Sequence, residues 1–414
     1  MLDMKFIAEH RAEVERSAEL RGYKIDLDKL LKVDSQRRKL QSRVDALREK
    51  RNALTAQMKN SKPTPDLIEQ GKKLKSELSD LETQLKNLTD DWTAQLKSVP
   101  NLLAPDVPPG GENDGVEVRR WGNCKKSARD HLDFALAKDW VDFERGAKVA
   151  GAKFYFLKGD LALLENAALQ FAIQTILKNG FTLMDVPNLV KENIAAGSGF
   201  APRTSDQSDS YYVEGEDLTL IATAEMPLTG YHANEILDET DLPKFYAGYS
   251  PCYRKEAGTY GKHARGLFRV HQFNKLEMYA YCLPEDSAKI HQKILGVEEA
   301  IWQAIGIPYR VVNIAAGDLG APAYQKFDIE YWSPADQTYR ELTSCSNCTD
   351  FQARNLNIRV RRTGGRIETL HTLNGTAASL ARTLVAIVEN FQDDSGDLIV
   401  PEVLRPFMFG RTKI

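Results

Sequence analysis

The chain has 414 residues, of which 42% are hydrophobic and 27% charged, and its formal net charge at pH 7 is -3. This length predicts one large domain and a smaller one, and the hydrophobic content excludes bulk disorder. The small net charge means that nucleic-acid binding must use a local basic patch. Five scattered cysteines make no disulfide framework, and no apolar run of about 18 residues occurs, so we expect a cytoplasmic protein without a signal peptide or membrane span.

Residues 27–99 contain two heptad patterns of apolar residues separated by prolines. The first pattern extends to Met58, and the second begins at Leu67. Between them, Pro63 and Pro65 cannot continue a helix. Two heptad patterns on either side of a proline turn predict an antiparallel helical hairpin. At a rise of about 1.5 Å per residue, this arm would be roughly 50 Å long.

The first helix of the predicted arm is basic. Its arginines are Arg37, Arg38, Arg43, Arg48 and Arg51. Charge runs of this kind are usually the solvated surface of a coiled coil. The alternative is an arm that lies along an RNA backbone, where arginines neutralise phosphates. The pattern alone leaves both interpretations open.

A proline- and glycine-rich stretch at 100–115 predicts a domain boundary. We therefore expect an N-terminal domain at 1–104, which contains the arm, and a second domain at 105–414. Strands joined mostly as hairpins and amphipathic helices follow in the second domain. Its predicted class is α+β with an antiparallel sheet, not a doubly wound parallel sheet. The segment 181–190 is predicted to be a strand interrupted by Pro187, and thus at an edge or an interface.

A long hairpin is predicted in the middle of the second domain. Aromatic and β-branched residues recur at period two in 244–253 and 267–281, which predicts the two strands. A glycine-bearing loop joins them. Its side chains Lys262, His263 and Arg265 suit a lid over phosphates or RNA.

Polar residues on one face of this hairpin suggest chemistry. The second strand would carry on that face Arg269, His271, Phe273, Lys275 and Glu277, and the first strand ends in Arg254 and Glu256. Arginine suits phosphate, an aromatic ring suits a base, and a carboxylate suits an amine or a hydroxyl. The alternative is an edge hairpin with a solvated polar face. We interpret His271 as structural.

The tripeptide Thr223–Glu225 lies at the end of an apolar strand, before Pro227. Taken alone, this pattern is more typical of a helix cap with an acid in the first turn than of a binding site.

A second polar patch, at 340–350, contains Glu341 and Ser344, whose oxygens could bind magnesium. Cys345 and Cys348 form a single CxxC without further zinc ligands, so we interpret them as buried structural cysteines.

A third patch contains Thr376 and, in an otherwise apolar helix, Arg382. An arginine in such a helix either pairs within the core or points at a ligand. The chain has neither GxxxxGK[ST] nor GxGxxG, so a nucleotide would not be bound by a Walker loop or a dinucleotide fold.

These segments together resemble the seryl-tRNA synthetases of bacterial type, a family of class II aminoacyl-tRNA synthetases. The resemblance covers the whole chain, including the arm, and it is carried by YRKEAG and GLFRVHQFNKLE (253–258 and 266–277), TAEMPLT (223–229), FDIEYW (327–332), ELTSCSNCTDFQAR (341–354) and LNGTAASLARTLVAIVENFQ (373–392). It implies a class II antiparallel sheet flanked by helices, with an N-terminal coiled-coil arm. It also implies a serine–tRNA ligase that uses ATP and Mg²⁺, and a homodimer whose interface includes 181–190.

The resemblance further implies roles for individual residues. For serine these are Thr223, Glu225, Arg254, Glu277 and Thr376. For ATP they are Arg254, Glu256, Arg269, Val270, Phe273, Glu341, Ser344 and Arg382, with Glu341 and Ser344 also holding magnesium. The arm arginines Arg37, Arg38, Arg43, Arg48 and Arg51 would bind tRNA(Ser) and also tRNA(Sec). No protein general base is expected.

Two other functions fit parts of the pattern. A related enzyme could load an amino acid onto a carrier protein, but such relatives lack the arm, and this chain has it. A non-catalytic RNA-binding protein would bind tRNA without ATP, and the presence of Arg254, Glu341 and Arg382 argues against it.

Overall fold

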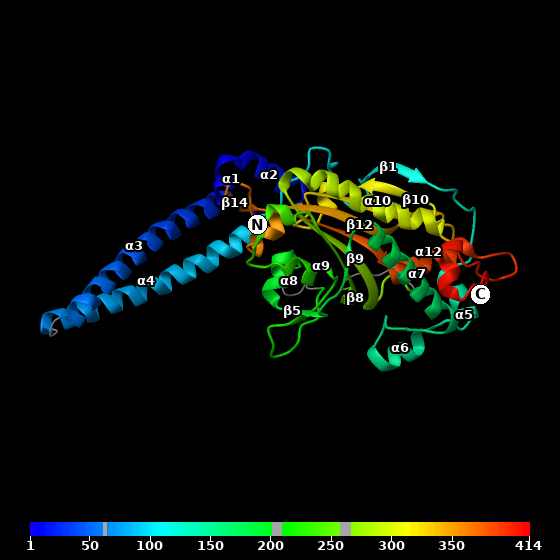
Figure 1. Ribbon diagram of the computed structural model, residues 1–414, viewed down its shortest axis with the longest axis horizontal. Helices are drawn as coiled ribbons and strands as arrows, with labels where there is room; N and C mark the ends of the chain where they lie inside the picture. Colours follow the sequence, from blue (N-terminus) through cyan, green and yellow to red (C-terminus); the bar gives the residue numbers. More distant parts are fainter. Residues whose placement is uncertain (61–63, 201–208, 257–265) are drawn as a thin grey trace. The chain divides into compact units, whose positions relative to one another are not determined.

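Two compact units make up the chain, Met1–Leu102 and Leu103–Ile414 (Figure 1). The structure is a computed structural model, and it describes residues 1–60, 64–200, 209–256 and 266–414. The predicted loop residues Lys262, His263 and Arg265 lie outside the described residues. No helix in the described part of the chain is long and apolar enough to span a membrane.

The first unit consists of helices. They are α1 (Met4–Glu9), α2 (Arg11–Leu20), α3 (Leu27–Asn60) and α4 (Pro65–Lys97). Capping residues mark the start of both long helices. Asp26 Oδ1 accepts from Lys29 N–H at 2.9 Å at the start of α3, and Thr64 caps α4, whose first residue is Pro65.

Helices α3 and α4 pack along their heptad seam, which confirms the predicted helical arm. Buried along the seam are Val44, Leu47, Leu78 and Leu81. A second apolar cluster joins the base of the arm to α1 and α2, and it contains Leu30, Leu96, Ile7 and Val14. Apolar side chains every three or four residues therefore account both for the packing of α3 against α4 and for the packing of the arm's base against α1 and α2.

The second unit is built on a sheet that has eight strands in the described residues. In spatial order they are β1 (Val116–Trp121), β10 (Tyr309–Asn313), β11 (Gln325–Ser333), β12 (Thr338–Thr349), β15 (His371–Ser379), β9 (Gln272–Cys282), β8 (Lys244–Tyr253) and β4 (Thr182–Asp185). Every neighbouring pair is antiparallel except β4 with β8. The predicted α+β class with an antiparallel sheet is confirmed. Strand β4 stands at the sheet edge, as Pro187 predicts.

The remaining elements are shorter or cover the sheet. The longer helices are α7 (Gly159–Lys178), α10 (Ser287–Ile305) and α12 (Leu380–Phe391). The short helices are α5 (His131–Ala137), α6 (Phe143–Ala150), α8 (Glu192–Ser198), α9 (Glu225–Gly230) and α11 (Phe351–Asn355), with 3-10 turns η2 (Glu239–Asp241), η4 (Pro284–Asp286), η5 (Ala316–Asp318) and η6 (Glu402–Met408). The small strands are β2 (Val141–Asp142), β3 (Phe156–Leu157), β5 (Leu189–Val190), β6 (Thr219–Leu220), β7 (Ile236–Asp238), β13 (Arg359–Arg361) and β14 (Ile367–Thr369).

Side chains of β9 alternate between the two faces of the sheet, so successive residues pack in two different clusters. Leu276 and Met278 belong to the main core, which also contains buried residues of α7, α10 and α12. Tyr279 and Tyr281 point to the other face, where they pack in a second cluster with residues of α9 and α11. Because side chains alternate along a strand, the odd-numbered residues before Tyr279 lie on that second face.

The second strand of the predicted hairpin begins later than expected, at Gln272 rather than at Leu267. Residues 266–271 form turns instead, because Leu267 donates its N–H to the side chain of His131 and not to β8. The predicted alternation of side chains therefore fails over this segment. It holds from Gln272 onward.

Candidate active site

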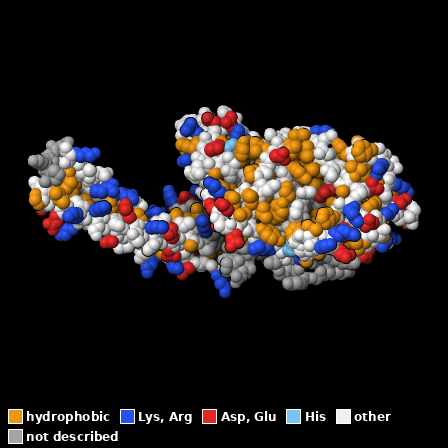
Figure 2. All heavy atoms as spheres, turned by 90° about the horizontal axis from the view of Figure 1, so that it is seen from below, with side chains coloured by type: hydrophobic (Ala, Val, Ile, Leu, Met, Phe, Trp, Pro, Cys, Tyr) orange, Lys and Arg blue, Asp and Glu red, His pale blue; other side chains and the backbone are white. Residues whose placement is uncertain are grey.

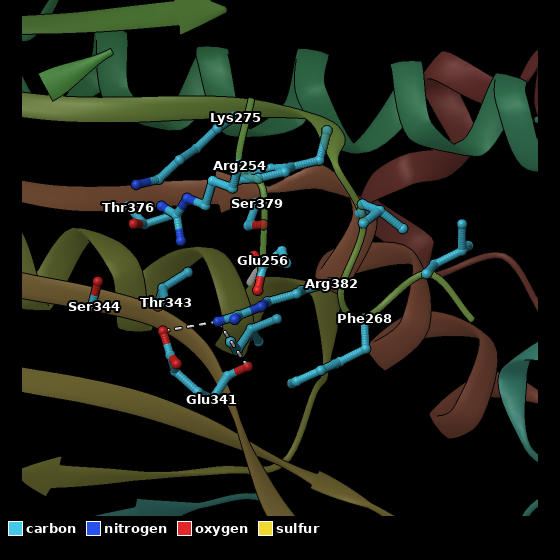
Figure 3. Close-up of a pocket in the computed structure, with 15 residues that line it drawn as sticks. Arg254, Glu256, Phe268, Lys275, Glu341, Thr343, Ser344, Thr376, Ser379 and Arg382 are labelled. Atoms are coloured by element: carbon cyan, nitrogen blue, oxygen red, sulfur yellow. Dashed lines mark hydrogen bonds and ion pairs between the residues drawn. The ribbon is translucent and has the colours of Figure 1, made fainter. Parts of the chain in front are cut away.

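A pocket of about 580 Å³, partly open to solvent, lies at the end of the β8–β9 hairpin and is lined from β9, β12, β15 and α12 (Figure 3). Its lining residues are Arg254, Glu256, Leu267, Phe268, Val270, Phe273, Lys275, Glu341, Leu342, Thr343, Ser344, Thr376, Ser379, Ala381 and Arg382. Of the predicted residues, all those expected at ATP except Arg269 line this pocket. Thr223, Glu225 and Glu277 do not line it, but the lining residue Lys275 contacts Thr223 and Glu277, and the N–H of Glu225 donates to Thr223 Oγ1.

Arg382 enters the pocket from the first turn of α12. Its Nη1 lies 2.8 Å from Glu341 Oε1 on β12, and its side chain is only 17% exposed. Burial opposes ionisation of Glu341, but the charges of Arg382 and Lys326 outweigh it and hold the pKa of Glu341 well below its usual range. The pocket therefore contains a fixed cation next to an ionised carboxylate.

The aromatic ring of Phe268 lies against two guanidinium groups. The Cζ of Arg382 lies 4.8 Å from the ring centroid, and that of Arg340 lies 5.1 Å away. Phe268 is not among the predicted site residues, because strand alternation assigns it to the face opposite Phe273. The segment is not a strand there, so both rings face the pocket.

Arg254 follows directly after β8. Its Cζ lies 5.3 Å from the ring centroid of Phe273, and its Nε donates to the carbonyl oxygen of Ala222 at 3.3 Å. His271 donates from Nδ1 to the carbonyl oxygen of Arg254 at 2.9 Å, so it fixes the backbone that carries this arginine. Arg269 does not line the pocket, because it pairs with Glu256 at 3.1 Å.

A buried ion pair lies at the inner end of the pocket. Lys275 Nζ contacts Glu277 Oε2 and lies 3.2 Å from Thr223 Oγ1. Glu277 is 1% exposed, and its Oε2 also accepts from Thr376 Oγ1 at 3.5 Å. A buried carboxylate requires such partners, because water no longer solvates it. Strand alternation predicts Lys275 on this face but indicates no role for it.

Glu225 is the first residue of α9, as the capping pattern predicts, yet its side chain is buried. Its Oε1 accepts from Gln352 Nε2 at 2.7 Å and from Asn374 Nδ2 at 2.9 Å. Burial, and then the charge of Glu277, raise the pKa of Glu225 to about 7. The residue is thus both an acid in a first helical turn and a group that changes charge near neutral pH.

Oxygen ligands for a hard cation lie together on β11 and β12. Glu341 and Ser344 line the pocket, and Ser344 is paired in the sheet with Asp328. Asp328 is buried, and its Oδ1 has no hydrogen-bond partner among the described residues, while Oδ2 lies 3.3 Å from Lys326 Nζ. Carboxylate and hydroxyl oxygens are the ligands that Mg²⁺ prefers, so this donor set fits the ion. Cys345 and Cys348 are buried free thiols, as predicted.

The arginines of the arm lie among acidic side chains. Arg43 pairs with Glu77 and Arg48 with Glu82, each at 2.8 Å, so both link α3 to α4. Arg37 and Arg38 both pair with Asp34, Arg37 also lies 4.4 Å over the ring of Trp92, and Arg51 hydrogen-bonds to Asn52. Figure 2 shows basic and acidic side chains interspersed along this surface.

Two family models match the chain, and together they cover most of it. The seryl-tRNA synthetase N-terminal domain matches residues 1–103, and the class II core domain of the tRNA synthetases for G, H, P, S and T matches residues 211–391.

Curated relatives extend the similarity over the full length. A serine–tRNA ligase of Dictyoglomus turgidum is 46% identical over 99% of this chain and 98% of its own, and one of Rubrobacter xylanophilus is 40% identical over 99% and 98%. Among solved structures, seryl-tRNA synthetase from Pyrococcus horikoshii, complexed with ATP, superposes with a TM-score of 0.87 at 38% identity, covering 100% of this chain and 99% of that one. The cytoplasmic serine–tRNA ligase of Naegleria fowleri, in complex with AMP, superposes with a TM-score of 0.84 at 32% identity, covering 100% and 98%. With its helical arm, its antiparallel sheet and these full-length relatives, the chain belongs to the serine–tRNA ligases, a family of class II aminoacyl-tRNA synthetases.

Proposed function

We propose that this chain attaches L-serine to the 3′ end of tRNA(Ser) in two steps. The carboxylate of serine attacks the α-phosphorus of ATP, which forms seryl-adenylate and releases pyrophosphate. The terminal ribose hydroxyl of the tRNA then takes the seryl group and releases AMP. The observation that carries the proposal is one pocket with two charge environments: arginines and aromatic rings at its mouth, and at its inner end Lys275, which contacts the buried carboxylate of Glu277 behind the lining.

The mouth of the pocket suits ATP. Arg254 and Arg382 supply the guanidinium groups for the phosphates, and each lies against an aromatic ring. We assign the adenine to the ring of Phe273, with Glu256 and Val270 beside it, and Arg269 to the outer phosphates. Little covalent chemistry is left for the protein, so positioning and stabilisation of charge should dominate the rate. We assign no side chain as a general base.

The inner end suits serine. We assign the ammonium group to Glu225 and Thr223, the carboxylate to Arg254, and the hydroxyl to Glu277 and Thr376. Glu277 is buried, so a substrate with a methyl group in place of the hydroxyl would lie against a carboxylate that water cannot reach, without offering it a hydrogen bond. A site of this kind rejects alanine strongly.

Glu341 and Ser344 would hold Mg²⁺ at the phosphates, because their oxygens line the pocket and fit its preference. When bound, the ion would neutralise charge on the phosphate oxygens. The arm supports a role in tRNA binding, with Arg37, Arg38, Arg43, Arg48 and Arg51 as candidates for phosphate contacts.

Further assignments rest on the family resemblance. We infer a homodimer whose interface includes 181–190, and the exposed apolar side chains of Leu183 and Leu189 in this segment support it. We also infer charging of tRNA(Sec) and a cytoplasmic location.

The test is amino-acid-dependent exchange of pyrophosphate into ATP, followed by charging of total tRNA. We expect exchange with serine and not with alanine, and serine attached only to tRNA(Ser) and tRNA(Sec). Exchange with no amino acid would contradict the ligase. Exchange without charging of tRNA would instead favour a carrier-loading enzyme.

A further inference from the structure

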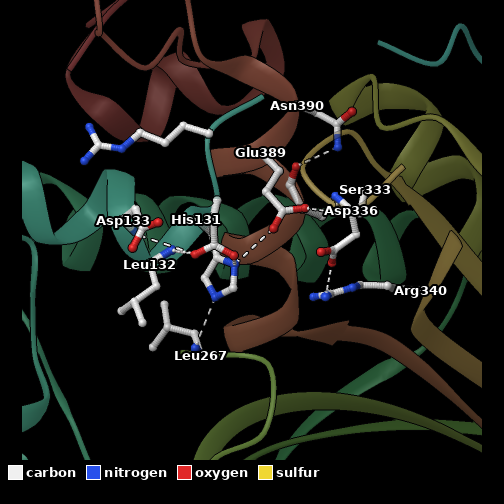
Figure 4. Close-up of polar contacts among 12 residues, drawn as sticks. His131, Leu132, Asp133, Leu267, Ser333, Asp336, Arg340, Glu389 and Asn390 are labelled. Carbon is white, nitrogen blue, oxygen red and sulfur yellow. Dashed lines mark hydrogen bonds and ion pairs between the residues drawn. The ribbon is translucent and has the colours of Figure 1, made fainter. Parts of the chain in front are cut away.

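A second buried polar cluster lies behind the pocket, around His131 (Figure 4). His131 is the first residue of α5, and it is 2% exposed. Its Nδ1 lies 3.0 Å from Glu389 Oε1, and its Nε2 lies 3.4 Å from the backbone nitrogen of Leu267. The proposed reaction uses neither His131 nor Glu389.

The partners of the imidazole ring determine its tautomer. A backbone N–H can only donate, so Nε2 accepts from Leu267 and carries no proton. Nδ1 therefore carries the proton and donates to Glu389. The other oxygen of Glu389 accepts from Ser333 Oγ at 2.6 Å and from Tyr331 Oη at 3.2 Å, so β11 fixes the carboxylate.

A metal ion would not suit this cluster, although Asp130, His131 and Glu389 lie close enough together to be its ligands. A metal on Nδ1 would leave the ring proton on Nε2. That proton would then face the N–H of Leu267, and two donors would meet. The geometry favours a hydrogen-bonded neutral histidine.

The ring of His131 lies directly beneath the turn that begins at Gly266. Gly266 has a φ of +67°, and a Cβ built there would lie 2.3 Å from Nε2. The histidine thus occupies the space that a side chain at this position would need. Its ring and its hydrogen bond together determine where the chain enters the pocket wall.

The next two residues are parts of the pocket itself. Leu267 is 2% exposed and lines the pocket. Phe268 lies against Arg382, which in turn pairs with Glu341. A shift of the backbone at Leu267 would move the ring that supports this arginine.

Helix α12 connects both ends of this arrangement. Arg382 and Glu389 are seven residues apart, about two helical turns, so they lie on the same side of the helix. One rigid element therefore presents the arginine to the pocket and the carboxylate to His131.

We infer that His131 is a positioning residue for ATP. Held in its Nδ1–H tautomer by Glu389, it fixes Leu267 and Phe268 so that Arg382 is placed for the nucleotide. His131 does not touch the substrate. The inference rests on the proposed function, because the pocket that His131 supports is the one assigned to ATP.

Two substitutions separate the two hydrogen bonds. In His131→Asn, the amide can reach Glu389 but not Leu267, whereas in His131→Gln the longer side chain can offer its oxygen to Leu267. In serine-dependent pyrophosphate exchange, we expect His131→Asn to raise KM for ATP about fivefold to tenfold, the effect of one hydrogen bond. KM for serine should stay within about twofold of the wild type, and His131→Gln should restore KM for ATP.

His232→Gln is the matched control. His232 is also buried and bridges two groups, Glu235 at 2.7 Å and Tyr246 Oη at 3.1 Å, but neither lines the pocket. We expect it to leave KM for ATP unchanged. All variants are assayed well below their measured Tm. An equal rise of both KM values in His131→Asn, or unchanged KM for ATP, would overturn the inference.

A second measurement uses the wild-type protein, so it does not depend on whether a variant folds. The ¹⁵N shifts of labelled histidine in the wild-type protein report which nitrogen of His131 carries the proton. Protonation at Nδ1 supports the inference, and protonation at Nε2 overturns it. Absence of serine-dependent exchange in the wild type would instead contradict the proposed function, so the two failures are distinguishable.

Discussion

Ion pairs of the same chemical type serve different purposes on the arm and in the pocket. On the arm, Arg43–Glu77 and Arg48–Glu82 join two helices, with all four side chains between 40% and 61% exposed. Such pairs contribute only about 0–1 kcal/mol, because water solvates the separated charges almost as well. In the pocket, the side chains of Lys275 and Glu277 are at most 9% exposed, so loss of one partner leaves a charge without solvent. Burial, rather than residue type, decides how much each charge matters.

The largest expected effect comes from removing a pocket arginine. Arg254→Ala should lower kcat/KM for serine-dependent exchange by about 10³, because the developing charge on the phosphate loses its guanidinium. The matched control is Arg48→Ala on the arm, which should leave exchange unchanged. Equal losses in both variants would abolish the contrast between the two regions.

Shortening the arm should separate its function from that of the pocket. Replacing residues 41–84 by a short glycine–serine turn keeps Leu30 and Leu96, which pack at the base. We expect exchange to remain at the wild-type rate while kcat/KM for charging tRNA falls by roughly 10² or more, since several phosphate contacts are lost together. Retained charging would show that the arm does not bind the tRNA.

Lys275→Gln tests the buried ion pair. Removing one partner of such a pair costs about 3–5 kcal/mol, so we expect kcat/KM for serine to fall about 30-fold to 100-fold, with the remainder lost from stability. The double variant Lys275→Gln/Glu277→Gln should lose less than the sum of the single variants, because no unpaired charge remains. Additive losses would mean that the two groups act independently.

The raised pKa of Glu225 predicts a pH dependence with a definite sign. The ammonium group of serine prefers the ionised carboxylate, so kcat/KM for serine should rise about tenfold from pH 6 to pH 8, around the pKa of about 7. The folded state also binds this proton more tightly than the unfolded chain, so the stability that it contributes is lost as the pH rises through 7. In Glu225→Gln, the rise in kcat/KM should disappear. If kcat/KM of Glu225→Gln still rises with pH, the pH dependence arises from another titratable group.

The smallest effects should come from single arginines of the arm. Within the described residues, the guanidinium of Arg51 bonds only to its neighbour Asn52, so Arg51→Ala should raise KM for tRNA about twofold to fivefold, less so at high salt, without lowering Tm. Arg37 lies over Trp92 and pairs with Asp34, so Arg37→Ala should also lower Tm. Equal changes in Tm for both variants would contradict this distinction.

The helices of the arm and the class of the sheet could be read from the sequence, because both are local patterns. Heptad spacing places Val44 and Leu81 on a common seam, and Thr64 with Pro65 begins the second helix. Alternation along β9 likewise places Phe273, Lys275 and Glu277 on one face. The motifs at Arg254, Glu341 and Arg382 indicated the nucleotide pocket by their chemical types and by resemblance to a known family.

The tertiary structure alone decided which of these groups meet. It delayed the start of the second hairpin strand to Gln272, because the N–H of Leu267 bonds to His131, 136 residues away, and Phe268 thereby faces the pocket. It also paired Arg382 with Glu341 and closed Lys275 and Glu277 off from water. Helix and strand preferences act between neighbours in the sequence, whereas burial and charge pairing depend on residues that only folding brings together.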